Sequence, residues 1–398
     1  MKAKLWLLTL LFSGILLLCC RAFSEEAKDI TRNCRIIPGD GREQADRLTD
    51  DNPYTFWHYL GEGNGFLTAE AFSGRKIAHV TIRFTQAPGA WCLQIPDENG
   101  NWLTVYEDRH AFLHAFGSLP VPSGTVRLAS LDPAMLEISE IRFYTEGELP
   151  PSVQVWEDAP EKADILFLAA HADDELIFFG GAIPVYTAQM QKAVAVAYLT
   201  DCGLERRTEL LNGLWSMGVR NYPILGPFPD QYKKSLEEAY EYMGGEKAVN
   251  DWIITLFRRY RPEVVVTHDI GGEYGHFQHI AAARGALAAF DQSADEAACP
   301  DSAAAWGPWQ VKKLYLHLWP ENRIRLDWSN PLSSLNGLTG LEAADRAFRF
   351  HRSQQNSRMS VRSTGADYDN TLFGLARSTV GPDEEGGDFL EHIHTSSN

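Results

Sequence analysis

Ile165-Leu166-Phe167-Leu168-Ala169-Ala170-His171-Ala172-Asp173-Asp174-Glu175 runs from an apolar segment into a histidine and adjacent carboxylates. Residues 165–169 predict a buried β-strand, because a short continuous apolar run fits a strand that is covered on both faces. Open α/β sheets place their active sites outside the carboxyl ends of such strands. Residues 171–175 are therefore the first candidates for catalytic chemistry.

A second polar cluster, Gly275-His276-Phe277-Gln278-His279, follows another apolar run at 264–266. Two polar clusters, each placed after a predicted strand, indicate one catalytic metal site. Such sites commonly have three ligands from His, Asp or Glu and one position open for water. His171 and Asp174 are close enough in sequence to bind one ion, and the second cluster would supply the third ligand.

Each cluster also has a purely structural interpretation. Asp173 and Asp174 would serve as a helix N-cap with a second carboxylate favoured by the helix dipole. His276 and His279 would be surface or capping imidazoles at helical spacing, and Tyr274 an ordinary packed aromatic. The two clusters together favour the metal site.

From residue 164 onward, predicted strands and helices alternate along the chain. The strands are predicted at 164–169, 193–199, 222–225, 264–267 and 313–318, and the helices at 177–191, 206–217, 247–260 and 279–290. Strands that alternate with helices predict an α/β fold with a mostly parallel sheet and helices on both faces.

Residues 30–144 show short alternating runs that are typical of an all-β domain. Asn99-Gly100 between two such runs is a strong β-hairpin signal. Several short strands with regular turns predict a β-sandwich. Trp57, Trp91 and Trp102 would either stack on sugar rings or fill the core of this sandwich, and the core is favoured.

The chain of 398 residues is long enough for two domains. Four segments are predicted: a signal peptide at 1–22, the β-sandwich at 27–147, a linker with Pro150-Pro151 at 148–163, and the α/β domain at 164–385. The formal net charge of −17 argues against a nucleic-acid or anionic-membrane partner.

The first residues predict export. Lys2 and Lys4 precede an apolar run at 5–18, and small residues stand at a possible cleavage site, which is the pattern of a signal peptide. The chain is therefore expected to be secreted or extracytoplasmic. A lipid-modified Cys19 or Cys20 and an uncleaved membrane anchor stay as alternatives.

Four cysteines would remain after cleavage: Cys34, Cys92, Cys202 and Cys299. An oxidising compartment permits disulfides, and two of the four fall within the predicted sandwich. Their scattered spacing does not match a zinc-thiolate site.

The clusters at 171–175 and 275–279, with Gly180-Gly181 between them, resemble the de-N-acetylases of the PIG-L/LmbE type. Arg206 with Glu209, Tyr274, and Phe350-His351-Arg352-Ser353-Gln354 extend the resemblance over 164–354. The resemblance implies a Rossmann-like fold. It also implies removal of an acetyl group from N-acetylglucosamine-type amides with a divalent metal, commonly Zn²⁺.

By position, the resemblance implies that His171, Asp174 and His279 are the metal ligands and that Asp173 is the general base. Ala172 stands where the family usually has proline, which loosens the turn without removing a ligand. Phe277-Gln278 replaces the usual Pro-Asp pair. A glutamine can bond to an imidazole but carries no charge, which puts metal affinity in question.

Three further residues receive roles from the same resemblance. His276 would stabilise the developing oxyanion or protonate the leaving amine, and Tyr274 would polarise the acetyl carbonyl. Arg206 would contact substrate hydroxyls or phosphate; without the resemblance it would be a surface charge on a helix.

The segment from Ala45 to Trp57 resembles the opening of discoidin-like (coagulation factor C-type) carbohydrate-binding modules. This resemblance implies a jelly-roll sandwich and a glycan ligand.

The leading hypothesis is an exported deacetylase acting on a carbohydrate or glycoconjugate. The alternatives are a carbohydrate-binding protein with an inactive deacetylase-like domain, and a related metallohydrolase acting on another amide or ester. The oligomeric state stays open.

Overall fold

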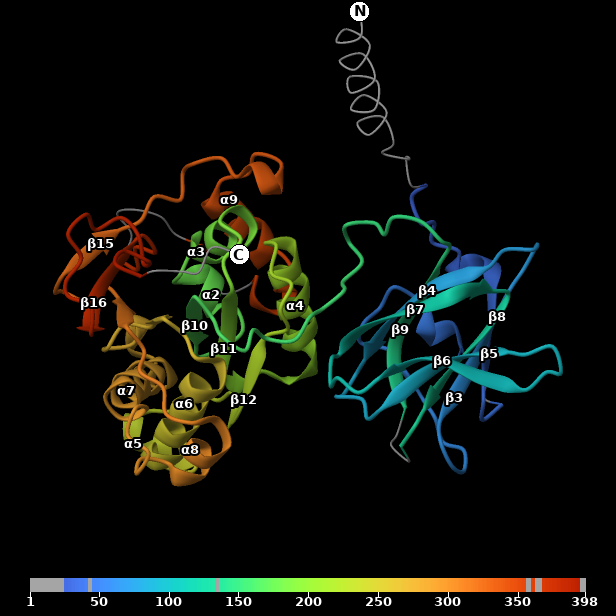
Figure 1. The fold of residues 1–398 in the computed structure, drawn as a ribbon, viewed down its shortest axis with the longest axis horizontal. Helices are drawn as coiled ribbons and strands as arrows, with labels where there is room; N and C mark the ends of the chain where they lie inside the picture. Colours follow the sequence, from blue (N-terminus) through green and yellow to red (C-terminus); the bar gives the residue numbers. More distant parts are fainter. Residues whose placement is uncertain (1–24, 42–44, 133–135, 356–358, 362–366, 394–398) are drawn as a thin grey trace, which may run out of the picture. The chain divides into compact units, whose positions relative to one another are not determined.

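A computed structural model of the protein describes residues 25–41, 45–132, 136–355, 359–361 and 367–393. The chain divides into two units, Met1–Val155 and Trp156–Asn398 (Figure 1). The predicted signal peptide at 1–22 lies outside the described residues. Among the residues that are described, no helix combines the length and the apolar character needed to cross a membrane.

The first unit is a sandwich of two antiparallel sheets. One sheet has the order β1 (Cys34–Pro38), β3 (Phe66–Ala71), β8 (Thr125–Ser130), β5 (Trp91–Pro96) and β6 (Trp102–Asp108); the other has the order β2 (Trp57–His58), β9 (Glu137–Tyr144), β4 (Ile77–Phe84) and β7 (His114–Ser123). Burial alternates along β4, where Val80, Ile82 and Phe84 are buried and Thr81 and Arg83 face outward. This alternation confirms the predicted all-β sandwich.

The tryptophans and cysteines of this unit can be compared with the expectations from the sequence. Trp57 and Trp91 are buried in the core, and the guanidinium carbon of Arg127 lies 3.8 Å from the centre of the Trp102 ring. Trp57 and Trp91 therefore fill the core of the sandwich, whereas Trp102 is half-buried with Arg127 over its ring. Cys34 and Cys92 are free thiols, as are the two cysteines of the second unit.

The second unit is built on a seven-stranded sheet. The strand order is β12 (Ile224–Pro229), β11 (Val194–Asp201), β10 (Ile165–Ala169), β13 (Val264–Thr267), β14 (Lys313–His317), β16 (Leu372–Ser378) and β15 (Arg323–Arg325). The first five strands are parallel, and β16 and β15 are antiparallel additions at one edge. The predicted Rossmann-like, mostly parallel sheet is confirmed, whereas the antiparallel edge was not predicted.

Helices cover both faces of this sheet (Figure 1). They are α2 (Asp174–Ile177), α3 (Ala182–Pro184), α4 (Gly203–Ser216), α5 (Leu236–Tyr242), α6 (Glu246–Tyr260), α7 (Phe277–Gln292), α8 (Pro300–Trp306) and α9 (Gly340–Phe348). Helices α5 to α8 lie on one side, and α2, α3, α4 and α9 on the other. Leu166 and Leu168 pack with the α6 and α7 core, while Phe167 contacts Phe179 and Phe389 on the opposite face.

The single helix predicted at 177–191 is wrong. The chain instead forms α2, α3 and a π-helical turn at Val185–Gln189, with a break at Gly180 and Gly181. Gly180 has φ +55°, and a Cβ there would lie 2.5 Å from the Asn370 side chain. A Cβ on Gly181 would lie 2.8 Å from Trp328. Segments from late in the sequence therefore approach this backbone too closely for a continuous helix.

The predicted domain end at 385 is too early, because packing of the second unit continues to Ile393. Phe389 is fully buried, and the Tyr186 hydroxyl donates to Asp388 at 2.6 Å.

Parts of the predicted linker at 148–163 are packed within the units. Val153 is buried in the first unit, and the Trp156 ring packs at 5.3 Å from Trp215 in the second.

Candidate active site

The site lies at the carboxyl ends of β10 and β13, which are neighbours in the sheet. From β10 the strand order continues through β11 and β12 on one side, and from β13 it continues to β14 on the other. The chain thus adds strands outward in one direction from β10 and in the opposite direction from β13. At such a reversal of strand order, α/β sheets open a crevice in which they bind ligands. Residues 171–174 leave β10 at this point, and His276 and His279 stand at the start of α7 soon after β13.

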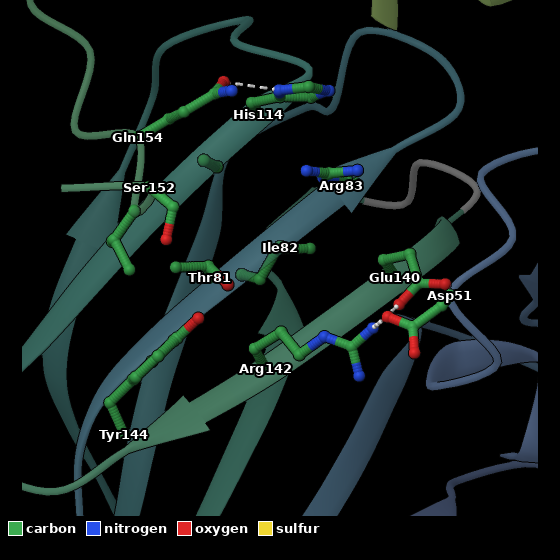
Figure 2. Close-up of a pocket in the computed structure, with 12 residues that line it drawn as sticks. Asp51, Thr81, Ile82, Arg83, His114, Glu140, Arg142, Tyr144, Ser152 and Gln154 are labelled. Atoms are coloured by element: carbon green, nitrogen blue, oxygen red, sulfur yellow. Dashed lines mark hydrogen bonds and ion pairs between the residues drawn. The ribbon is translucent and has the colours of Figure 1, made fainter. Parts of the chain in front are cut away.

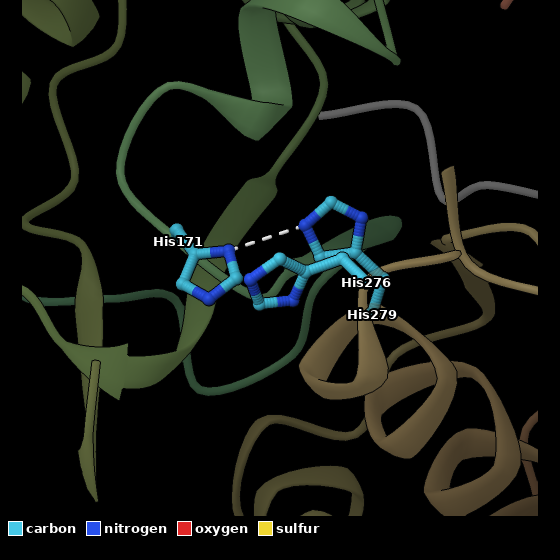
Figure 3. Close-up of side chains that lie close together, drawn as sticks. All are labelled: His171, His276 and His279. Atoms are coloured by element: carbon cyan, nitrogen blue, oxygen red, sulfur yellow. Dashed lines mark hydrogen bonds between the residues drawn. The ribbon is translucent and has the colours of Figure 1, made fainter. Parts of the chain in front are cut away.

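Three side-chain atoms from these two segments form a small triangle. His171 Nδ1 lies 3.1 Å from Asp174 Oδ2 and 3.2 Å from His279 Nε2, and His279 Nε2 lies 3.3 Å from Asp174 Oδ2. Figure 3 shows the imidazoles of His171 and His279 turned toward each other. Tetrahedral ligand atoms bonded to zinc at about 2.0–2.1 Å lie about 3.3 Å apart, so this spacing fits one metal ion.

The second nitrogen of each ligand imidazole is held by an acceptor. His171 Nε2 donates to Gln278 Oε1 at 2.9 Å, and His279 Nδ1 donates to Glu273 Oε2 at 2.8 Å. These partners assign the ring protons to the outer nitrogens. In the neutral imidazoles that a metal ion binds, the nitrogens that face the triangle are therefore acceptors, and they meet an acceptor oxygen of Asp174. Convergent acceptors are what a cation needs.

Two other histidines lie close enough to join the ligand set, but their acceptor nitrogens are already occupied. His268 Nε2 accepts the backbone N–H of Ala170 at 2.9 Å. His276 Nδ1 accepts the backbone N–H of Gln278 at 3.3 Å, so this histidine does cap α7. The structure therefore favours His171, Asp174 and His279, the three ligands predicted from the sequence.

Asp173 stands at the turn between β10 and α2. It occupies the N-cap position of α2 but makes no side-chain cap hydrogen bond, so the alternative capping role is not supported. Its backbone has φ +116°, a strained conformation for a residue with a side chain. Such strain persists where surrounding contacts enforce it, and it clusters at functional sites.

Arg206 of α4 holds this turn in place. Its Nη2 lies 3.1 Å from Asp173 Oδ1 and also donates to the carbonyl of Ala172, and its Nη1 donates to Asp230 Oδ2 at 2.6 Å. The guanidinium group thus positions Asp173. The predicted contact between Arg206 and substrate stays a prediction.

The two adjacent aspartates have opposite electrostatic environments. Burial, together with the neighbouring Asp174, raises the pKa of Asp173 to about 7. Burial also disfavours the charged form of Asp174, but His279 and His171 outweigh it and hold the pKa of Asp174 well below its usual range. Asp174 is therefore the carboxylate that stays ionised and suits a metal ligand.

A cavity of about 260 Å³ opens in front of these groups. It is lined by His171, Asp173, Asp174, Ile177, Phe178, Arg206, Asp230, Tyr274, His276, Gln354 and Met359. Of the predicted site residues, only His279 is absent from this lining, and its side chain is fully buried. Tyr274 is 49% exposed and lies at the rim, with its ring 5.7 Å from that of His276.

The sequence interpretation missed Glu273, which is buried behind the ligands. Its Oε2 accepts from His268 and His279 at 2.8 Å, and its Oε1 accepts from His317 Nδ1 at 2.7 Å. Burial opposes ionisation of this carboxyl, but the histidines, His268 above all, hold the pKa of Glu273 well below its usual range. The available signals were a glutamate two residues before the 275–279 cluster and a histidine at the end of β14.

Comparisons with known proteins agree with this geometry. The family model described as "PIG-L: GlcNAc-PI de-N-acetylase" matches residues 166–290, which contain all seven predicted site residues. Residues 166–290 form a PIG-L family domain. This confirms the resemblance to the family and the prediction of a hydrolase of the N-deacetylase type.

The relatives found by sequence carry deacetylase names. A protein of Geodermatophilus obscurus named 1D-myo-inositol 2-acetamido-2-deoxy-alpha-D-glucopyranoside deacetylase is 27% identical over 259 residues, 54% of this chain and 86% of the relative. A protein of the same name from Streptomyces avermitilis is 30% identical over 191 residues, 40% of this chain and 62% of the relative. The matches thus span between about three fifths and most of these relatives.

Solved structures resemble parts of the chain. The conserved protein TT1542 from Thermus thermophilus is 22% identical with a TM-score of 0.35, over 48% of this chain and 80% of that one. The family 32 carbohydrate-binding module of Clostridium perfringens NanJ, solved with galactose, is 15% identical with a TM-score of 0.26, over 30% of this chain and 98% of that one.

Proposed function

We propose that the PIG-L domain hydrolyses the N-acetyl amide of an N-acetylglucosamine-type sugar or glycoconjugate, with a divalent metal bound. The products are acetate and a free amino sugar. The observation that supports this most directly is the convergence of three acceptor atoms from His171, Asp174 and His279 beside the carboxylate of Asp173. The relatives, named as deacetylases of a 2-acetamido-2-deoxyglucopyranoside, support the same substrate class.

The triangle atoms His171 Nδ1, Asp174 Oδ2 and His279 Nε2 would hold the metal. Two imidazoles and one carboxylate suit Zn²⁺, and other divalent metals bind such nitrogen and oxygen sites as well. When bound, the metal supplies a Lewis acid that polarises the acetyl carbonyl and lowers the pKa of a water molecule at the open position.

Asp173 takes the proton from the attacking water. Arg206 fixes Oδ1 of this carboxylate, so Oδ2 is the atom that accepts the proton. The water oxygen then forms a bond to the amide carbon, and the carbonyl oxygen becomes an oxyanion. A positioned carboxylate that removes this proton contributes typically 10²–10⁴-fold to the rate.

His276 and Tyr274 act on the other side of the amide. His276 Nδ1 accepts from a backbone N–H, so its Nε2 carries the proton and can donate to the oxyanion. Tyr274 offers its hydroxyl to the acetyl oxygen from the cavity rim. Asp173, which now holds the proton of the water, then gives it to the departing nitrogen as the carbon–nitrogen bond breaks.

Acetate release from a panel of N-acetylated amino sugars, measured with parallel elemental analysis of bound metal, tests the proposal. We expect Asp173→Asn to keep its metal and to lose at least about 100-fold in acetate release, because the base is gone while the ligands remain. The exposed Asp345→Asn variant of α9 should match the parent chain. Near-normal turnover of metal-loaded Asp173→Asn would falsify the assignment of the base.

The same panel separates the alternatives. A metal-loaded chain that releases no acetate from any sugar supports a carbohydrate-binding protein with an inactive domain. Turnover confined to non-sugar amides or esters supports a related metallohydrolase with the same site.

We also propose that the chain is exported. The support is the basic and apolar pattern of residues 1–18, which lie outside the described part of the structure. Fractionation of producing cells, with N-terminal sequencing of the mature protein, distinguishes cleavage near residue 22 from a lipidated Cys19 or Cys20 and from a retained anchor.

A further inference from the structure

The sandwich unit carries a second cavity, of about 210 Å³, on the outward face of its four-stranded sheet. Outward-facing residues of β4, β7 and β9 form the floor, and Asp51 and residues 152–154 line the sides. Figure 2 shows these side chains. The cavity has polar and charged walls, which is unlike the packed apolar core beneath the same sheet.

Strand register places three polar side chains in one row across the floor. Arg83 of β4 is the direct antiparallel partner of His114 on β7 and of Glu140 on β9. Side chains that are directly opposite in an antiparallel pair lie on the same face of the sheet. Arg83 therefore stands between an imidazole and a carboxylate.

Both flanking groups keep one buried atom without a partner. His114 Nδ1 donates to Gln154 Oε1 at 2.6 Å, while the buried Nε2 has no hydrogen bond within the described part of the chain. Glu140 Oε2 accepts from Arg142 at 2.6 Å, while the buried Oε1 likewise has none. Both unpartnered atoms are acceptors, and buried acceptors of this kind normally have a donor.

Arg83 has carboxylates nearby but, within the described ranges of the chain, no anion in direct contact. Among the residues that the structure describes, no side-chain hydrogen bond or ion pair reaches its guanidinium group, and Figure 2 draws none. The nearby carboxylates of Asp51 and Glu140 are both bound by Arg142, at 2.5 and 2.6 Å. Burial removes hydration from Arg83 and lowers the pKa of its guanidinium group, and the nearby carboxylates, Glu140 foremost, offset this only in part.

We propose that this cavity binds a small polyhydroxylated carboxylate, such as a sugar acid, with the carboxylate on Arg83 and hydroxyl groups donating to His114 Nε2 and Glu140 Oε1. An anion satisfies the guanidinium group, and hydroxyls satisfy the two acceptors. The volume admits one sugar ring.

Titration calorimetry of the purified full chain with D-glucuronate, D-galacturonate, D-glucose and acetate tests this without any variant. We expect at least one of the two sugar acids to bind, and both D-glucose and acetate to bind at least about tenfold more weakly, because each lacks one half of the recognised chemistry. The proposal is overturned if neither sugar acid binds, or if acetate or D-glucose binds as well as the sugar acids.

Arg83→Met, with Arg35→Met on the other sheet as the matched control, locates the site. Arg83→Met should weaken binding of the sugar acid at least about tenfold and leave the melting temperature equal to or above that of the parent chain, because methionine fills the space without a buried charge. Arg35→Met should bind as the parent does. Unchanged affinity in a folded Arg83→Met chain would place the ligand elsewhere and overturn the proposal.

Discussion

At the scale of single residues, the buried carboxylate of Glu273 organises the ligand side of the site. It accepts hydrogen bonds from three histidines, one of which is the ligand His279. Partners of this kind fix the tautomer and orientation of a ligand, and their loss typically lowers metal affinity 10–100-fold. Glu273 touches neither the cavity nor the reacting atoms, so it is a positioning residue.

Glu273→Gln should therefore weaken the metal site. A glutamine has one carbonyl oxygen and an N–H₂ group, so it cannot accept from all three imidazoles. We expect metal affinity, measured by competition with a chromogenic chelator, to fall by about 10–100-fold. Acetate release should recover at saturating metal, since the ligands themselves remain. The exposed Glu237→Gln variant of α5 is the control, and equal affinity in both variants would contradict the role of Glu273.

Gln278 shows why a departure from the family pattern was hard to interpret from the sequence. The sequence put metal affinity in question because glutamine replaces a charged aspartate. In the structure Gln278 Oε1 accepts from His171 Nε2, and its Nε2 donates to the carbonyl of Pro229 at 2.9 Å. A neutral acceptor thus orients the ligand. Which histidine it would serve depended on the meeting of β10 and α7, and sequence spacing does not give that.

At the scale of elements, β10 and β13 were predictable because each is a nearly continuous apolar run buried on both faces. The break after α2 and the edge strand β16 were not predictable in this way. Gly180 and Gly181 end the helix because Asn370 and Trp328 approach their backbones from far along the chain. Such tertiary contacts override the local helical pattern.

The packing of α4 against the end of α9 contains a pH-sensitive element, His351. Its ring is buried, and within the described residues neither ring nitrogen has a hydrogen-bond partner. Burial, with a smaller effect of Arg206, lowers the pKa of His351 to about 3. An unfolded histidine titrates near 6.5, so between about pH 6.5 and pH 3 the unfolded state binds the extra proton and stability falls as pH falls.

His351→Leu should remove this dependence. The free energy of unfolding of the α/β unit, measured with urea, should fall as the pH is lowered from about 6 to about 4. Per pH unit, this fall should be up to about 1.4 kcal/mol smaller in the variant than in the parent. His392→Gln, at an exposed position, should keep the parental slope. Identical slopes in all three chains would show that His351 does not titrate on unfolding.

At the scale of the whole molecule, the C-terminal segment is an integral part of the α/β unit. Lys313 of β14 is fully buried and pairs with Asp383, which also accepts from the Tyr315 hydroxyl at 2.6 Å. The glycine-rich composition around Gly386 concealed this, and the predicted domain therefore ended too early. An ion pair between distant residues leaves no local pattern in the sequence.

Asp383→Asn should destabilise the α/β unit by about 3–5 kcal/mol, because it leaves the Lys313 ammonium buried without its anion. Thermal and urea unfolding measure the loss. Adding Lys313→Met to this variant should recover much of the stability, since two uncharged side chains then replace the ion pair. No recovery in the double variant would mean that the buried charge is not the cause.

The central claim is that the segments after β10 and β13 meet on one metal ion. An anomalous-difference map from crystals of the zinc-loaded chain tests this directly. We expect one strong peak in the site, at about 2.0–2.2 Å from His171 Nδ1, Asp174 Oδ2 and His279 Nε2. The absence of a peak there, or a peak bonded to only one of the two segments, would contradict the account.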